Sequence, residues 1–112
     1  MLLPAQVWLI IEPMDMRLGI DGLSSRVQHA LGRSPCDGTS YAFRNRRGNR
    51  LKLLQCDGTG VWLSQRRLHE GTFVWLVPGE TVFTLTQAQW QWLITGVDWK
   101  RLEARPMSDW KV

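Results

Sequence analysis

Positive charge is concentrated in one stretch of this chain, and that stretch has the clearest chemical meaning of any in the sequence. Between Tyr41 and Glu70 there are seven cations and two acids, whereas the rest of the 112 residues is close to charge balance, so the net charge of +4 belongs to this segment. Guanidinium groups spaced along neighbouring strands can form bidentate hydrogen bonds to successive phosphates. We therefore expect contact with a polyanion, and the candidate residues are Arg44, Arg46, Arg47, Arg50, Lys52, Arg66 and Arg67.

The register of a hairpin over residues 40–56 decides which way these cations face, because a shift of one residue exchanges the two faces of a strand. A three-residue loop, Arg47-Gly48-Asn49, separates apolar from charged side chains completely, and we predict it over a two-residue loop. Its apolar face would hold Tyr41, Phe43, Leu51 and Leu53, and its basic face would hold Arg44, Arg46, Arg50 and Lys52. Like charges facing each other cost up to about 1 kcal/mol a pair, and a bound polyanion would relieve them. The alternative is a solvated tip, or ion pairs with acids such as Asp57 or Glu70.

Seven tryptophans offer a second set of candidate binding residues. Exposed indoles can stack on bases or dock on a partner protein, but tryptophan also fills much of the core of a small domain. Three lie at core-like positions in the apolar pattern: Trp8, Trp75 and Trp90. We predict that the candidate partner-binding residues are Trp92, Trp99 and Trp110.

Evidence for catalysis or for a metal site is weak. His29 and His69 are isolated, and Cys36 and Cys56 lack the close spacing of zinc ligands, so we expect free structural thiols and no metal. The Asp57-Gly58-Thr59-Gly60 stretch has no following lysine and is expected to be a tight turn. Magnesium-dependent nuclease chemistry on Asp15, Asp21 and Asp57 is the weaker alternative. We predict no catalytic residue and no cofactor.

Hydrophobic periodicity predicts the elements that must position these residues. A helix after a cap at Asp15 has an apolar stripe from Met16 to Leu31 and ends at Gly32. Thr86 and Gln89 form a capping box for a second helix that ends near Gly96. From Ser40 onward the period is two, with turn signals between short segments. Strands are predicted at 6–11, 40–46, 50–56, 60–66, 72–77 and 81–85.

These elements predict a single compact α+β domain over residues 1–97, followed by a partly ordered tail over 98–112. Connections this short favour an antiparallel meander sheet of about five to six strands, packed by two helices. The longest uncharged apolar stretch is far below the roughly 20 residues that cross a bilayer, so we expect no membrane partner. Since the start of the chain lacks the pattern of a secretory signal, we expect a cytoplasmic protein.

Three stretches together resemble a known family: DMRLGIDGLSSRV (15–27), FRNRRGNRLKLLQCDGTGVWLSQRRLHEGTF (43–73) and LTQAQWQWLITGVDW (85–99). The chain resembles the small TnpB-type accessory protein encoded by the second open reading frame of the insertion sequence sixty-six family, which is unrelated to the RNA-guided nuclease also called TnpB. The first motif matches at Asp15, Met16, Arg17, Gly19, Asp21 and Gly22. The chain departs from the family pattern at Cys36 and Cys56.

The resemblance implies a bacterial mobile-element protein that assists DNA transposition and recombination beside a separate large transposase, which carries the catalytic acids. It implies DNA and that transposase as partners. The first hypothesis is therefore a non-catalytic subunit that binds DNA backbone through the basic hairpin. The alternative is a protein adaptor for the transposase, with no DNA contact of its own.

Overall fold

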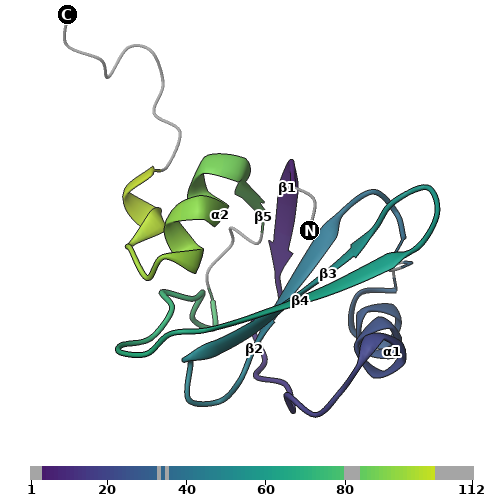
Figure 1. The fold of residues 1–112 in the computed structure, drawn as a ribbon, viewed down its shortest axis with the longest axis horizontal. Coiled ribbons are helices and arrows are strands. Elements are labelled where there is room, and N and C mark those ends of the chain that lie inside the picture. Colours follow the sequence, from purple (N-terminus) through teal and green to yellow (C-terminus); the bar gives the residue numbers. More distant parts are fainter. Residues whose placement is uncertain (1–3, 33, 35, 80–83, 103–112) are drawn as a thin grey trace, which may run out of the picture.

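Five strands form one sheet, with two α-helices packed against it (Figure 1). The computed structural model describes residues 4–32, 34, 36–79 and 84–102. The elements in chain order are β1 (Gln6–Leu9), α1 (Ile20–Leu31), β2 (Ser40–Arg44), β3 (Arg50–Cys56), β4 (Val61–Arg67), β5 (Thr84–Thr86), α2 (Gln87–Ile94) and the short 3-10 helix η1 (Trp99–Leu102). The strand order across the sheet is β4-β3-β2-β1-β5.

The sheet confirms the α+β class and is mostly antiparallel, but it is mixed. β1 runs parallel to β2, because the chain crosses from one to the other through α1, the kind of crossover that a parallel pair needs. The pairs β2–β3, β3–β4 and β1–β5 are antiparallel. The segment predicted as a strand at 72–77 has no strand pairing, although Phe73, Trp75 and Leu76 are buried and the Trp75 indole donates to the Ile10 carbonyl at 2.8 Å.

Both faces of the sheet are covered, and each has its own apolar core. On one face, α1 packs Leu23 and Val27 against Tyr41, Phe43 and Leu54. The other face carries α2, η1 and the 73–76 segment; its core includes Val7, Leu9, Leu51, Leu53, Trp90, Leu93 and Trp99. Figure 1 shows α1 and α2 on opposite sides of the twisted sheet. No helix in the described part of the chain has the length and apolar character to cross a membrane.

The predicted register of the β2–β3 hairpin is wrong. Phe43 lies opposite Lys52, and Arg44 lies opposite Leu51, so the connection is a four-residue loop over 46–49 rather than a three-residue one. The four cations Arg44, Arg46, Arg50 and Lys52 therefore do not share one exposed face. The predicted register assumed that one face of the hairpin is exposed to water. In the structure helices cover both faces of the sheet, so both faces of the hairpin carry apolar side chains.

The two helices begin differently. α1 starts later than predicted, with Gly19 rather than Asp15 at its N-cap, while Gly32 does form the predicted left-handed C-cap at φ 63°. α2 has the predicted capping box: the Thr86 hydroxyl accepts from the Gln89 amide at 3.2 Å, and the Gln89 side chain accepts from the Thr86 amide at 2.9 Å. Val97, which follows the end of α2, is exposed.

The expectation of free thiols is also wrong. Cys36, in the α1–β2 connection, forms a disulfide with Cys56 at the end of β3, with 5.2 Å between their Cα atoms. The twenty-residue separation in sequence gave no sign that the antiparallel hairpin brings these two positions together. The bond ties the segment after α1 to the end of the sheet that lies away from the β2–β3 loop.

Candidate nucleic-acid interface

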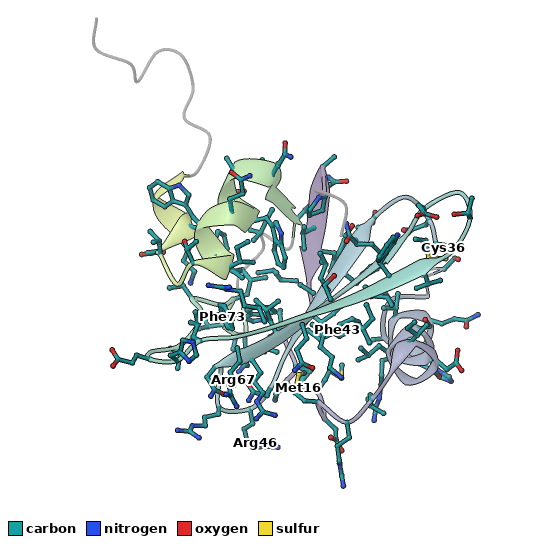
Figure 2. The ribbon with its side chains drawn as sticks, viewed as in Figure 1. Met16, Cys36, Phe43, Arg46, Arg67 and Phe73 are labelled. Atoms are coloured by element: carbon teal, nitrogen blue, oxygen red, sulfur yellow. A yellow bond between two sulfur atoms is a disulfide. The ribbon has the colours of Figure 1, made fainter. Side chains whose placement is uncertain are left out.

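Four arginines gather at one end of the sheet, and we call them the arginine cluster: Arg46, Arg47, Arg50 and Arg67. Arg46 and Arg47 lie in the exposed β2–β3 loop, Arg50 begins β3 and Arg67 ends β4. Figure 2 shows Arg46 and Arg67 toward the same end of the molecule, away from Cys36. Within the described ranges, none of the four guanidinium groups forms an ion pair.

Two members of the cluster face each other directly. Arg50 is the register partner of Arg67 across β3 and β4. The Leu68 amide bonds to the Asn49 carbonyl one step further along, so the Arg50–Arg67 pair is of the non-hydrogen-bonded kind, in which side chains lie closest. Like charges placed this way repel. The like-charge pairs that the sequence predicted between β2 and β3 do not form, because Arg44 lies opposite Leu51 and Lys52 lies opposite Phe43. A different like-charge pair, Arg50 with Arg67, lies between β3 and β4.

Asn45 shapes the loop that carries Arg46 and Arg47. Its side-chain oxygen accepts from the amides of Gly48 (2.9 Å) and Arg50 (3.0 Å), and its side-chain nitrogen donates to Asn49 Oδ1 at 2.8 Å. Gly48 adopts φ +80°, a left-handed conformation that glycine adopts without strain. Asn45 is not among the residues predicted from the sequence. The signal that could have identified it is an asparagine at the start of a glycine-containing turn.

Lys52 lies outside the cluster. It is 7 % exposed, and its ammonium donates to the backbone carbonyls of Met16 (2.6 Å) and Leu18 (2.9 Å). A buried cation needs such partners, because burial without them costs several kcal/mol. Lys52 therefore holds the 15–19 segment against β3.

Arg44 and Arg66 are also tied to the protein's own backbone. Arg44 is half-buried and donates from Nη2 to the Ile11 carbonyl at 3.1 Å. Arg66 is exposed, but its Nε donates to the Ile94 carbonyl at the end of α2. Both therefore have side-chain contacts to the backbone that, among the described residues, the members of the arginine cluster lack.

The first family-like motif builds the turn that Lys52 binds. The Asp15 carboxylate accepts from the Arg17 amide and from its guanidinium, with the shortest contact at 2.7 Å. These hydrogen bonds lower the pKa of Asp15 from 3.8 to about 2. Gly19 caps α1, and a Cβ at Gly22 would come within 2.9 Å of the Leu18 side chain. Asp21 is exposed in the first turn of α1.

Asp57 forms the predicted tight turn between β3 and β4. One carboxylate oxygen accepts from the amides of Thr59 (2.7 Å) and Gly60 (2.8 Å), and the other accepts from the Trp62 indole at 2.9 Å. The Thr59 amide contributes most, and the Trp62 indole next, to lowering the pKa of Asp57 from 3.8 to about 2. The carboxylate is occupied with the turn and with the indole.

The tryptophans are distributed between the core and the surface differently from the prediction. Trp75 and Trp90 are in the core as predicted, and Trp8 is half-buried against the α1-side core. Trp92 is 37 % exposed on α2. Trp99 is instead 1 % exposed, so its indole is not at the surface, and Trp110 lies outside the described residues. Trp62, not singled out in the sequence, is 45 % exposed.

The described ranges contain no group of three or more His, Cys, Asp or Glu side chains that could hold a metal ion. Asp15, Asp21 and Asp57 do not form such a group. Asp15 and Asp57 are held by contacts within their own turns.

Comparison with known proteins places the chain in a family. The family described as "IS66 Orf2 like protein" matches residues 5–104. Among curated proteins of Sinorhizobium fredii, uncharacterized protein y4hO is 36 % identical over 106 residues, covering 95 % of this chain and 89 % of the relative. Uncharacterized protein y4jC is 29 % identical over 103 residues, covering 92 % and 88 %. No solved structure matches the chain. The chain belongs to the family of IS66 Orf2-like proteins.

Proposed function

We propose that the chain is a non-catalytic accessory protein of DNA transposition that contacts DNA backbone through the arginine cluster. Family membership supports the transposition role. The observation that carries the DNA contact is the gathering of four guanidinium groups, without ion-pair partners in the described part of the chain, at one end of the sheet. Phosphates would relieve the repulsion between Arg50 and Arg67 and accept bidentate hydrogen bonds from Arg46 and Arg47.

The salt dependence of binding tests this proposal. If all four arginines neutralise phosphates, the slope of log affinity against log salt is roughly −3.6 for a duplex. The measurement is fluorescence anisotropy of a labelled duplex titrated with the full chain at several salt concentrations. Absence of binding at about 50 mM salt to both element-end and random duplexes would overturn the proposal.

A pair of variants with equal net charge localises the contact. Arg46→Gln with Arg47→Gln removes two positive charges from the loop and should reduce the slope by roughly 1.8. The control, Gln6→Glu with Gln28→Glu, changes the net charge by the same amount at exposed positions. Gln6 lies at the end of the sheet opposite the loop, because it precedes Val7, the partner of Ser40 at the start of β2. Equal losses of affinity in both variants would mean that net charge, not the cluster, drives binding.

The second candidate function is that of a protein adaptor for the large transposase. It is favoured by Trp92, whose indole is partly exposed on α2, and by the neighbouring exposed Val97. Trp92→Ala should then abolish co-purification with the transposase, whereas the Arg46→Gln, Arg47→Gln variant should leave it intact. The opposite pattern would exclude this adaptor surface.

A further inference from the structure

One edge of the sheet carries a long strand without a neighbour in the described part of the chain. β4 stands first in the strand order, and β3 is its only partner among the described strands. It has seven residues, with no proline and no glycine to interrupt it. Natural proteins usually shorten, bend or cover such edges, because the free backbone groups invite another strand. Two large apolar side chains beside this edge, Val61 and Trp62, are 39 % and 45 % exposed.

The hydrogen bonds at both ends of β4 show which backbone groups point outward. The backbone amide of Asp57 donates to the Gly60 carbonyl, and the backbone amide of Leu68 donates to the Asn49 carbonyl. Since hydrogen-bonded and non-hydrogen-bonded pairs alternate along an antiparallel ladder, the even-numbered residues between these ends bond to β3. The amides and carbonyls of Val61, Leu63, Gln65 and Arg67 therefore face outward.

We propose that β4 is a homodimer interface, in which two copies pair their β4 strands antiparallel about a twofold axis at Ser64. Leu63 then lies opposite Gln65 of the second copy, and Val61 lies opposite Arg67 of the second copy. All four are outward-facing residues, so each pair can exchange two backbone hydrogen bonds. The two sheets join into one continuous sheet, with the same surface used by both copies.

The side chains favour this register over its neighbours. Trp62 lies opposite Arg66 of the second copy on the same face, in a non-hydrogen-bonded pair where side chains lie closest. A guanidinium against an indole face is an attractive cation–π pair, and the twofold axis provides it twice. In each copy the Arg66 guanidinium exchanges its bond to the Ile94 carbonyl for the indole of the second copy, and that indole stays bonded to Asp57 of its own chain. A twofold axis at Gln65 would leave Val61 and Trp62 without a partner residue in the second β4 strand. A twofold axis at Leu63 would leave Arg66 and Arg67 without one. Only the Ser64 axis uses all seven residues and keeps cations apart.

Hydrogen exchange of the full-length wild-type chain tests the proposal directly. Between about 10 µM and about 1 mM protein, the amides of Val61, Leu63, Gln65 and Arg67 should gain protection as the dimer forms. The amides of Trp62, Ser64 and Arg66 bond to β3 and should be protected at both concentrations. A chain that stays monomeric in light scattering at about 1 mM, or a dimer that protects other amides instead, overturns the proposal.

Exchanging the two partners provides an independent test of the register. Trp62→Arg alone would place arginine against arginine, so the dimer dissociation constant should rise at least tenfold. Trp62→Arg with Arg66→Trp restores an indole opposite a guanidinium and should recover the dimer. Because the exchange also removes the Trp62–Asp57 and Arg66–Ile94 hydrogen bonds, circular dichroism must show that both variants are folded. Gln65→Pro removes one outward amide without removing a bond to β3, and should give a folded monomer. If Gln65→Pro is folded and dimerises as the wild type does, the β4 interface is wrong. The DNA titrations above are separate, because the dimer is measured without DNA.

Discussion

Lys52 is predicted from the sequence to be a binding residue, but in the structure its contacts stabilise the fold. Charge counting placed it correctly in the basic segment, but could not reveal that its ammonium is buried against the Met16 and Leu18 carbonyls. Burial depends on the 15–19 segment crossing β3, which is a contact between residues more than thirty positions apart. This contact joins the first and second family-like motifs.

Replacing Lys52 with methionine keeps most of the unbranched apolar stem of the side chain but leaves the Met16 and Leu18 carbonyls without their donor. We expect Lys52→Met to lower the free energy of unfolding by about 2–4 kcal/mol, because hydrogen bonds from a charged group are lost at a buried site. Denaturant unfolding measures this. The control Arg47→Gln removes an exposed cation and should change stability by no more than about 0.5 kcal/mol. Equal effects in the two variants would contradict a structural role for Lys52.

Asp57 makes the stability of the β3–β4 turn depend on pH. Its pKa is about 2 in the folded chain and close to 3.8 when free of its partners. A lowered pKa means that the carboxylate stabilises the fold fully above about pH 4, and that this contribution is lost as the pH falls toward 2. Asp57→Asn should therefore show a smaller fall in stability between pH 4 and 2 than the wild type does. Parallel acid-unfolding curves for the two chains would contradict this.

Elements with complete local signals were predictable. The capping box of α2 and the Gly32 cap of α1 depend on residues close in sequence, and the structure confirms both. The 72–77 segment has strand-like alternation, but it covers the α2-side core as extended chain without pairing. Whether a segment pairs as a strand depends on which other backbone segment lies beside it. The alternation of apolar and polar residues indicates only which side chains are buried.

The β2–β3 loop is an element whose shape depends on one side chain. Asn45→Ala removes the acceptor of the Gly48 and Arg50 amides, so we expect a loss of about 1–2 kcal/mol in unfolding free energy. Thermal unfolding followed by circular dichroism measures it. Asn49→Ala keeps the Asn45 oxygen in place and should cost less. If the two variants are equally stable, Asn45 does not organise the loop.

The disulfide joins two elements and should contribute to stability through the unfolded state. Closing a loop of this length is worth about 3 kcal/mol in the chain-entropy account, so Cys36→Ser with Cys56→Ser should lower the unfolding free energy by about 2–4 kcal/mol. Intact mass measured with and without reduction shows first whether the bond is present. A reduced wild type as stable as the oxidised one would contradict the expected contribution.

Across the whole molecule, helices cover both faces of the sheet. The register of the β2–β3 hairpin therefore could not be predicted from its pattern of apolar and charged residues. Alternation identifies the buried face of a strand only when the other face meets water. Here Tyr41, Phe43 and Leu54 pack under α1, whereas Leu51 and Leu53 pack under α2. The predicted separation into one apolar and one basic face would have left one of the two helices without a core.

Double-mutant cycles can measure this two-sided core. Phe43 and Leu54 share the α1-side core, so Phe43→Leu and Leu54→Val should couple by about 0.5 kcal/mol or more in unfolding free energy. Phe43 and Leu53 lie on opposite faces, so Phe43→Leu and Leu53→Val should be additive to within about 0.3–0.5 kcal/mol. A three-residue loop would place Phe43 directly opposite Leu53 and reverse the two results. These mild substitutions keep the chain folded, so the pair that couples identifies the register in solution.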